Sequence, residues 1–306
     1  MASNPTPDND DIALALAEEL ADGCHALEVT LGIKQNTEAV MRAAIAAALA
    51  ARVNHSAKLQ LLRDRTAELQ TADDAAIATL TNCQLRFFKL FGKTYNGQWQ
   101  TAGWPGGKII VPSKQDQRYT LLTVLAIYFT NTPASESTEV GATAALCTAA
   151  AAAFSTARQA VNSAETAEGT AMAARKATMK TLRKRIRSLI VEIGTLIAED
   201  DRQYETFGLN VPANPSAPLG ITALTLTAPG GGKIHAAWPY ATRMTGTRLL
   251  TKRQGIDVVF QNAGTADGLE KTLEGFTAGQ VVDVQAIPYN DGGDGPGSPV
   301  KTVTVQ

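Results

Sequence analysis

The sequence predicts a multidomain protein in which α structure is followed by β structure: an elongated helical bundle, then a seven-stranded β-sandwich. Ala-rich segments with helical apolar spacing occupy residues 1–210, whereas short alternating runs separated by Gly, Pro and Asn occupy residues 219–306. Three prolines within the connecting residues 211–218 favour an extended, semi-rigid linker. We therefore expect a helical domain at 1–210 and a β domain at 219–306.

Helix start and stop signals divide the first domain. Gly23 is expected to end a first helix, because glycine commonly follows the last helical turn. Asn36 is a candidate N-cap for a second helix, and residues 71–74 have the pattern of a capping box that opens or renews it. The expected helical segments are 11–21, 36–70, 71–91, 116–132 and 138–201.

The second half of the last helical segment carries an apolar repeat of about 3.5 residues. Such a repeat predicts packing against other long helices, and long helices with short connections predict an up-and-down bundle. Small side chains at 43–51 and 149–153 would let helices approach closely. The two seam positions of the repeat hold Met172, Met179, Ile186 and Ile193, and Leu182, Leu189 and Leu196.

The β domain is marked by an aromatic strand and a later turn. Trp238 is expected to pack between two sheets, and a glycine-containing turn at 273–279 is expected to lead into a strand at 281–287. Over residues 218–306 these motifs resemble those of a fibronectin type III domain. The expected core of this domain includes Trp238, Leu273, Val282 and Val284.

The resemblance implies a spacer or a binding module, and it carries no ligand with it. The family's inward Tyr falls at Val282 in this sequence, so its corner hydrogen bond is expected to be missing. No Arg-Gly-Asp tripeptide occurs. The whole chain also resembles bacterial proteins that join an N-terminal helical domain to a fibronectin type III domain, and that resemblance implies no known activity.

Composition bounds the classes of function. The 306 residues carry 21 basic and 22 acidic side chains up to residue 210, and 7 of each beyond it, so neither domain has the basic excess of a dedicated nucleic-acid binder. No stretch is apolar enough to span a membrane, and the N-terminus lacks a Sec signal peptide. The chain is expected to be soluble, and either cytoplasmic or released by a non-Sec route.

Metal, disulfide and cofactor sites are not predicted. Three cysteines, Cys24, Cys83 and Cys147, have no close or metal-like spacing, so they are expected to be small core residues. The three histidines are isolated, and no phosphate-loop or dinucleotide fingerprint is complete. The sequence therefore predicts no catalytic, cofactor-binding or metal-binding residues.

Two segments are candidate interaction sites. Tyr95, Trp99 and Trp104 lie in a loop rich in Gly and Pro, where aromatic rings either anchor the loop or bind a ligand. Residues 175–187 hold seven basic and no acidic side chains. They form either a solvated face or a contact with an acidic patch, such as 8–11 or 199–201 of a neighbouring copy. The basic candidates are Arg183, Lys184, Arg185 and Arg187.

These observations favour a non-catalytic structural or interaction protein with no small-molecule substrate. We expect a homo-oligomeric or polymeric protein, a self-assembling subunit of a filament, surface or virion that displays the fibronectin-like domain. The alternative is an adhesin or carbohydrate-binding module, which would use the sandwich loops at 289–298 or the aromatic loop at 95–104.

Overall fold

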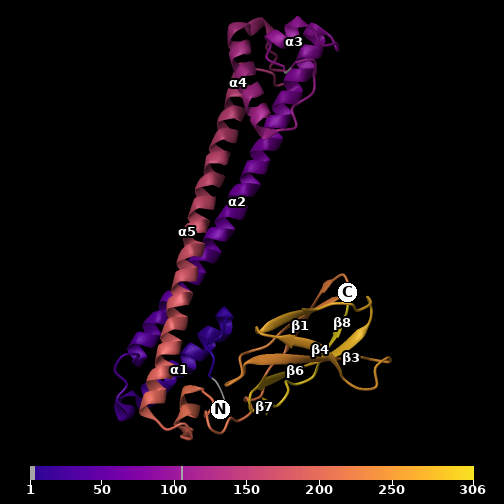
Figure 1. Cartoon of the computed structure of the whole chain (residues 1–306). Helices are drawn as coiled ribbons and strands as arrows, with labels where there is room; N and C mark the ends of the chain where they lie inside the picture. The colour runs from indigo at the N-terminus through magenta and orange to yellow at the C-terminus, as the bar shows by residue number, and fades with distance from the viewer. Residues whose placement is uncertain (1–3, 105) are drawn as a thin grey trace. The chain divides into compact units, whose positions relative to one another are not determined.

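A long helical region precedes a β-sandwich-like pair of sheets, and this confirms the predicted order of α and β structure (Figure 1). The computed structural model describes residues 4–104 and 106–306. The chain forms two compact units. The first joins residues up to Ala51 to residues 175–306, and the second is the continuous stretch 52–174.

The helical region contains two helices of more than fifty residues. These are α2 (Glu38–Phe91, 54 residues) and α5 (Ala144–Leu196, 53 residues), and each contributes to both compact units. The shorter helices are α1 (Asp10–Leu31), α3 (Gly97–Thr101) and α4 (Gln115–Asn131). Short 3₁₀ segments, η1 (Pro133–Ser135) and η2 (Arg202–Phe207), follow α4 and α5.

The predicted helix end at Gly23 and the predicted helix start at residues 71–74 were wrong, because both positions lie inside continuous helices. Helix α1 runs past Gly23 and ends at Leu31, and Gly32 caps it with a left-handed φ of 73°. Gly23 instead makes room for η2, since a Cβ there would lie 2.3 Å from Cδ1 of Phe207. At the predicted capping box, the hydroxyl of Thr71 donates to the carbonyl of Ala67 at 3.1 Å, a bond made within α2.

In the first unit, α1, the start of α2 and the end of α5 surround one apolar cluster, named here the base core. Leu16 and Leu20 come from α1, and Met41 and Ile45 from α2. The seam of α5 faces this core, so the seam packs against helices of the same chain. Its buried members are Met179, Leu182, Ile186, Leu189 and Ile193, whereas Met172 is half-buried and Leu196 is exposed.

The second unit contains an aromatic cluster, named here the head core, which includes Phe87, Trp99, Trp104 and Phe129. Phe87 packs edge to face on Trp99 with ring centroids 5.8 Å apart, and the two indoles pack edge to face at 5.3 Å. Helix α2 supplies Phe87 and α4 supplies Phe129, and the segment between these helices supplies Trp99, on α3, and Trp104.

A buried ion pair fastens α4 to α2 beside the head core. Arg118 on α4 donates its Nε to Asp73 on α2 at 2.7 Å, and its Nη1 to the carbonyl oxygens of Pro112 at 2.9 Å and Ser113 at 2.7 Å. Both charged side chains are buried. Because Arg118 also binds the carbonyls of Pro112 and Ser113, the pair ties the loop before α4 to both helices. Loss of either charged partner would leave the other charge buried and unpaired, which strongly destabilises a fold.

The sheet region, residues 225–304, consists of two antiparallel sheets. The three-stranded sheet has the order β1 (Thr225–Gly230), β2 (Lys233–Ala237), β5 (Glu270–Leu273). In the five-stranded sheet β4 (Gln261–Ala266), β3 (Gly246–Arg253) and β6 (Val281–Asn290) lie in order, and β7 (Gly293–Asp294) and β8 (Lys301–Thr304) both pair with β6.

Alternation along β6 shows how the sheet region buries its apolar face. Every second residue of this strand is buried, as period-2 patterning requires. Val282 and Val284 of β6 join Leu273 and Trp238 in one cluster, named here the sheet core. The side chain of Trp238 sits there with the residue only 5% exposed.

Helix α1 also contributes to the sheet core. Ile12 is buried among the residues of that core, although its neighbours Ala13 and Leu16 belong to the base core. The side chain of Asn9 fixes the start of α1 by accepting the backbone N–H groups of Asp11 at 2.9 Å and Ile12 at 3.2 Å. The helix is therefore anchored at the residue that enters the sheet core.

Trp238→Ala should lower the free energy of unfolding of the first unit by about 3–5 kcal/mol, because it replaces a buried aromatic side chain with a cavity. Trp238→Phe is the matched control and should lose much less. Denaturant unfolding of the full-length chain measures both changes. An unshifted midpoint for the alanine variant would contradict the assignment of Trp238 to the core.

Arg118→Ala should lower the free energy of unfolding of the second unit by about 3–5 kcal/mol, since Asp73 would stay buried without its partner. The double variant Asp73→Ala/Arg118→Ala should lose less than the sum of the two single variants. Unfolding followed by near-ultraviolet circular dichroism reports on the aromatic head core. Strictly additive losses would show that the two side chains do not interact.

Candidate functional site

The basic run of α5 binds the N-terminal segment of its own chain. Asp10 accepts from Nη2 of Arg175 at 2.8 Å and from Nη2 of Arg183 at 2.6 Å. Nε of Arg183 also donates to the carbonyl of Pro7 at 3.0 Å, and its Nη2 to that of Asp8. Burial alone would raise the pKa of Asp10, but the hydrogen bonds from the two arginines lower it below its usual value. One member of the acidic patch at 8–11, Asp10, thus pairs with basic side chains of its own chain.

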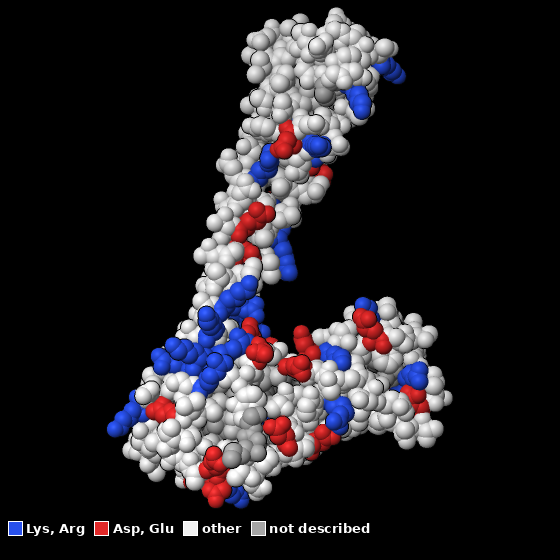
Figure 2. Space-filling view, in the orientation of Figure 1, with Lys and Arg blue, Asp and Glu red and all other residues white. Residues whose placement is uncertain are grey.

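The remaining basic side chains of this run are exposed on α5. Lys180, Lys184 and Arg187 line a shallow hollow together with Thr181 and Arg183. Figure 2 shows Lys and Arg side chains gathered over this part of α5. Within residues 4–104 and 106–306, Lys176, Lys180, Lys184, Arg185 and Arg187 form no ion pair with an acidic side chain, so their charge faces solvent.

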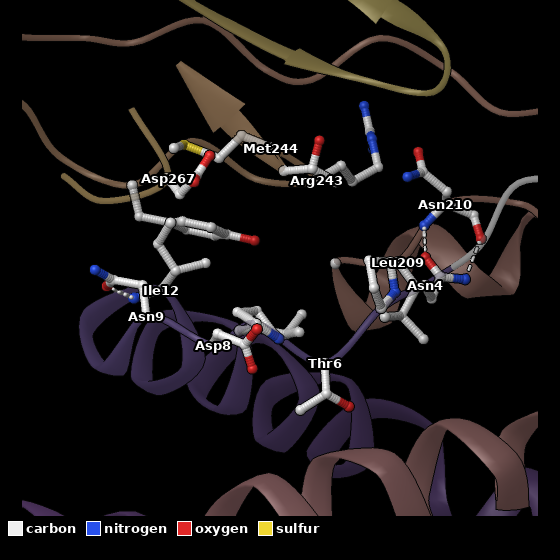
Figure 3. A pocket seen from close by; sticks show the side chains of 16 residues that line it. Asn4, Thr6, Asp8, Asn9, Ile12, Leu209, Asn210, Arg243, Met244 and Asp267 are labelled. Carbon is white, nitrogen blue, oxygen red and sulfur yellow. Dashed lines mark hydrogen bonds between the residues drawn. The ribbon is translucent and has the colours of Figure 1, made fainter. Parts of the chain in front are cut away.

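Three asparagines join the N-terminal segment, the residues that follow η2 and the sheet region. Asn4 and Asn210 exchange two hydrogen bonds, of 2.9 and 2.8 Å, between the side chain of the first and the backbone of the second (Figure 3). Nδ2 of Asn290 on β6 donates to Oδ1 of Asn210 at 3.2 Å and to the carbonyls of Ser216 and Arg243 at 3.0 and 2.9 Å. Asn210 and Asn290 are buried, and these bonds give partners to Oδ1 of Asn210 and Nδ2 of Asn290.

A cavity of about 280 Å³ lies beside this asparagine network. In Figure 3, Thr6 and Asp8 of the N-terminal segment border it on one side, and Met244 and Asp267 of the sheet region border it on the other. Leu209, which follows η2, also lines it. The lining is mixed, with amides, hydroxyls and carboxylates among apolar side chains. The cavity is therefore bordered by all three segments, and no single kind of charge dominates its wall.

Glu19 is a partly buried carboxylate at the contact between α1 and the sheet region. Its Oε1 accepts a hydrogen bond from the hydroxyl of Thr242, whereas its Oε2 has no hydrogen-bond partner among the described residues. Gly208 packs directly against it, since a Cβ at that position would lie 2.2 Å from Oε2. Burial raises the pKa of Glu19 to about 7, although the bond from Thr242 and the charge of Arg243 oppose that rise.

The candidate aromatic loop lies in the head core. Trp99 is 0% and Trp104 2% exposed. Their indole N–H groups donate to the backbone carbonyls of Gly92 at 3.3 Å and Ile110 at 3.2 Å, and the hydroxyl of Tyr95 donates to the carbonyl of Trp104 at 3.3 Å. These contacts are those of loop anchors, and the two indoles present no exposed face for stacking on a sugar or a base.

Sequence reasoning missed Glu19, the asparagine network and a pair of touching cysteines, Cys83 and Cys147. Each depends on residues that lie far apart in the chain, so no local spacing could have revealed it. Among the described residues, no group of three His, Cys, Asp or Glu side chains could hold a metal ion. None of the described helices is long and apolar enough to cross a membrane.

Solved structures that contain fibronectin type III domains match about 30% of the chain. The FN1-FN3 domains of chicken CNTN1 align with 15% identity and a TM-score of 0.28, covering 30% of this chain and 34% of that one. The FN5 domain of Drosophila Lar aligns with 19% identity and a TM-score of 0.26, covering 29% and 96%.

A third match is the sixth fibronectin type III domain of human fibronectin type III domain containing protein 3. It aligns with 18% identity and a TM-score of 0.27, covering 30% of this chain and 89% of that one. This chain thus spans about a third of the chicken structure and 17% of a twitchin kinase region from C. elegans that also matches. No protein-family model and no curated protein matches the chain.

The raised pKa of Glu19 predicts a pH-dependent stability of the first unit. Its folded pKa of about 7 exceeds the reference value of 4.5, so the stability it contributes is complete below about pH 4.5 and is lost as pH rises through about 7. Glu19→Gln keeps a neutral side chain and should remove this loss. At pH 8 it should exceed the parent stability by about 2 kcal/mol, a value reduced for partial exposure.

Thermal melts of the full-length chain between pH 5 and pH 8 would measure the difference between the Glu19→Gln variant and the parent. Glu18→Gln is the matched control, because the neighbouring Glu18 pairs with Arg42 at the surface at 2.6 Å. Equal pH slopes for the parent and Glu19→Gln would contradict a raised pKa of Glu19 in the folded protein.

Proposed function

We propose that this chain is a non-catalytic structural protein, a subunit that assembles with copies of itself and displays a seven-stranded, fibronectin-like domain. The observation that carries the proposal is the exposed basic surface of α5, named here the basic face and defined by Lys180, Lys184 and Arg187. It is a concentrated charge without an acidic partner among the described residues of its own chain.

A second surface of opposite charge supports assembly. Glu199 and Asp200 follow the end of α5 and are both exposed, and they are named here the acidic corner. The next acidic residue, Asp201, is used within the chain, because its side chain accepts the backbone N–H of Gln203 at 2.8 Å and caps η2. Complementary surfaces of this kind give specificity and speed to association.

The two surfaces differ, so the contact between copies is heterologous. The basic face of one copy would meet the acidic corner of the next, leaving a free acidic corner and a free basic face at the two ends. Repetition of such a contact gives either a ring or an open filament, depending on the rotation between copies. We favour the open form, in line with a subunit of a filament or surface layer.

The sheet region is proposed as the displayed part of the subunit. Sheets ordered β1-β2-β5 and β4-β3-β6-β8, with Trp238 buried between apolar strands, support a fibronectin-like sandwich in which the two-residue β7 belongs to the connection before β8. Its role would be that of a spacer or recognition module carried by the helical assembly.

A charge swap tests the assembly. The face variant Lys180→Glu/Lys184→Glu/Arg187→Glu and the corner variant Glu199→Lys/Asp200→Lys should each associate less than the parent, because like charges would then meet. An equal mixture of the two variants should associate again, since each altered surface regains an opposite partner. Sedimentation velocity at low and high salt measures this, and the parent's association should weaken at high salt.

The control variant is Lys89→Glu/Lys93→Glu/Lys108→Glu. It changes net charge by the same amount as the face variant, at exposed lysines of the second unit. It should associate like the parent. A parent that remains monomeric at high concentration, or a mixture of the swapped variants that does not recover, would overturn the proposed contact.

A further inference from the structure

Two of the three cysteines touch each other in the second unit. Cys83 on α2 and Cys147 on α5 lie 64 positions apart in the sequence, yet their Sγ atoms are 3.6 Å apart. Both side chains are fully buried in the head core. Small residues of the same helices, Ala76 on α2 and Ala151 on α5, are buried in this core as well, and they allow the helices to come close.

We propose that Cys83 and Cys147 are an oxidation site at which an intramolecular disulfide joins α2 to α5. Bonded sulfur atoms lie about 2.05 Å apart, so the two would have to approach by about 1.6 Å from their present contact. Rotations about the side chains of two neighbouring cysteines can supply such a movement. The third cysteine, Cys24, lies in the base core and belongs to the other unit, so it has no part in the reaction.

The oxidant is a small-molecule disulfide such as oxidised glutathione. The Cys147 thiolate attacks one sulfur of that disulfide, which breaks its S–S bond and releases one small thiolate. Cys83 then loses its proton and attacks the sulfur of Cys147 in the mixed disulfide, which expels the second small thiolate. Two protein thiols are oxidised, one small disulfide is reduced to two thiols, and both protons end on the released thiols.

The order of attack follows from the contact between the sulfurs. The hydrogen bond with Cys83 lowers the pKa of Cys147, although burial opposes this, whereas the same contact and burial raise the pKa of Cys83. Cys147 is therefore the thiol that more readily supplies the attacking thiolate. Since both sulfurs are buried, the oxidant reaches them only when the helices open locally, and we expect slow oxidation.

The crosslink would close the chain around α3 and α4, because both helices lie in sequence between the two cysteines. A disulfide that closes a long loop stabilises the fold mainly by restricting the unfolded chain. Oxidation should therefore raise the thermal midpoint of the second unit while leaving the first unit unchanged. The site would make the strength of the helical pairing depend on the redox state of its surroundings.

The experiment incubates the full-length chain with oxidised glutathione or with a reducing agent, then blocks free thiols under denaturing conditions and maps the peptides by mass spectrometry. We expect a Cys83–Cys147 crosslinked peptide, a loss of two hydrogens from the protein mass, and one blocked thiol at Cys24. Burial raises the pKa of Cys24 to about 12, and its thiol donates to the carbonyl of Asn36 at 3.4 Å, which makes it the internal control.

Two serine variants complete the design. Cys24→Ser should still form the crosslink, and Cys147→Ser should not, so the rise in thermal midpoint on oxidation should survive in the first and vanish in the second. Full blocking of both Cys83 and Cys147 in the parent after prolonged oxidation would overturn the proposal. A mapped disulfide to Cys24, or only glutathione adducts on the two cysteines, would overturn it as well.

Discussion

Helix α1 serves two apolar cores at once, and the first unit depends on this sharing. Ile12 enters the sheet core, while Leu16 and Leu20, one and two turns later, fill the base core. Burial of a side chain of this size contributes about 1.5–3 kcal/mol. Removing α1 would therefore expose parts of both cores, and this explains why the sheet region and the base of the helices form one compact unit.

Polar contacts fix the position of α1 and its N-terminal segment against the sheet region. Apolar packing tolerates small shifts, whereas the bonds among Asn4, Asn210 and Asn290 hold only at one relative position of the three segments. Arg175 and Arg183 add a charged clamp on Asp10. The same clamp pairs two members of the basic run within the chain, so Lys180, Lys184 and Arg187 carry the charge that is left for a contact with another molecule.

Sequence patterns predicted features that repeat along the chain, and missed those formed by single distant partners. The seam containing Leu182 and Ile186 could be read from its period, because a repeated apolar face must be buried. Gly23 was misread as a helix end, since only the fold shows that Phe207 packs against it. Glu19 and the Cys83–Cys147 pair were invisible for the same reason: nothing nearby in the sequence specifies their partners.

The division of the chain into units has a consequence for synthesis on the ribosome. The second unit is continuous, so it can fold as soon as residues 52–174 have emerged, whereas the first unit needs segments from both ends of the chain. Once the second unit has formed, its ends lie close together, and the entropy of closing that long loop has already been spent. We expect the sides of α1 that face α5 and the sheet region to stay uncovered until residues 175–306 have emerged, and site-specific crosslinking of stalled nascent chains to chaperones would reveal that interval.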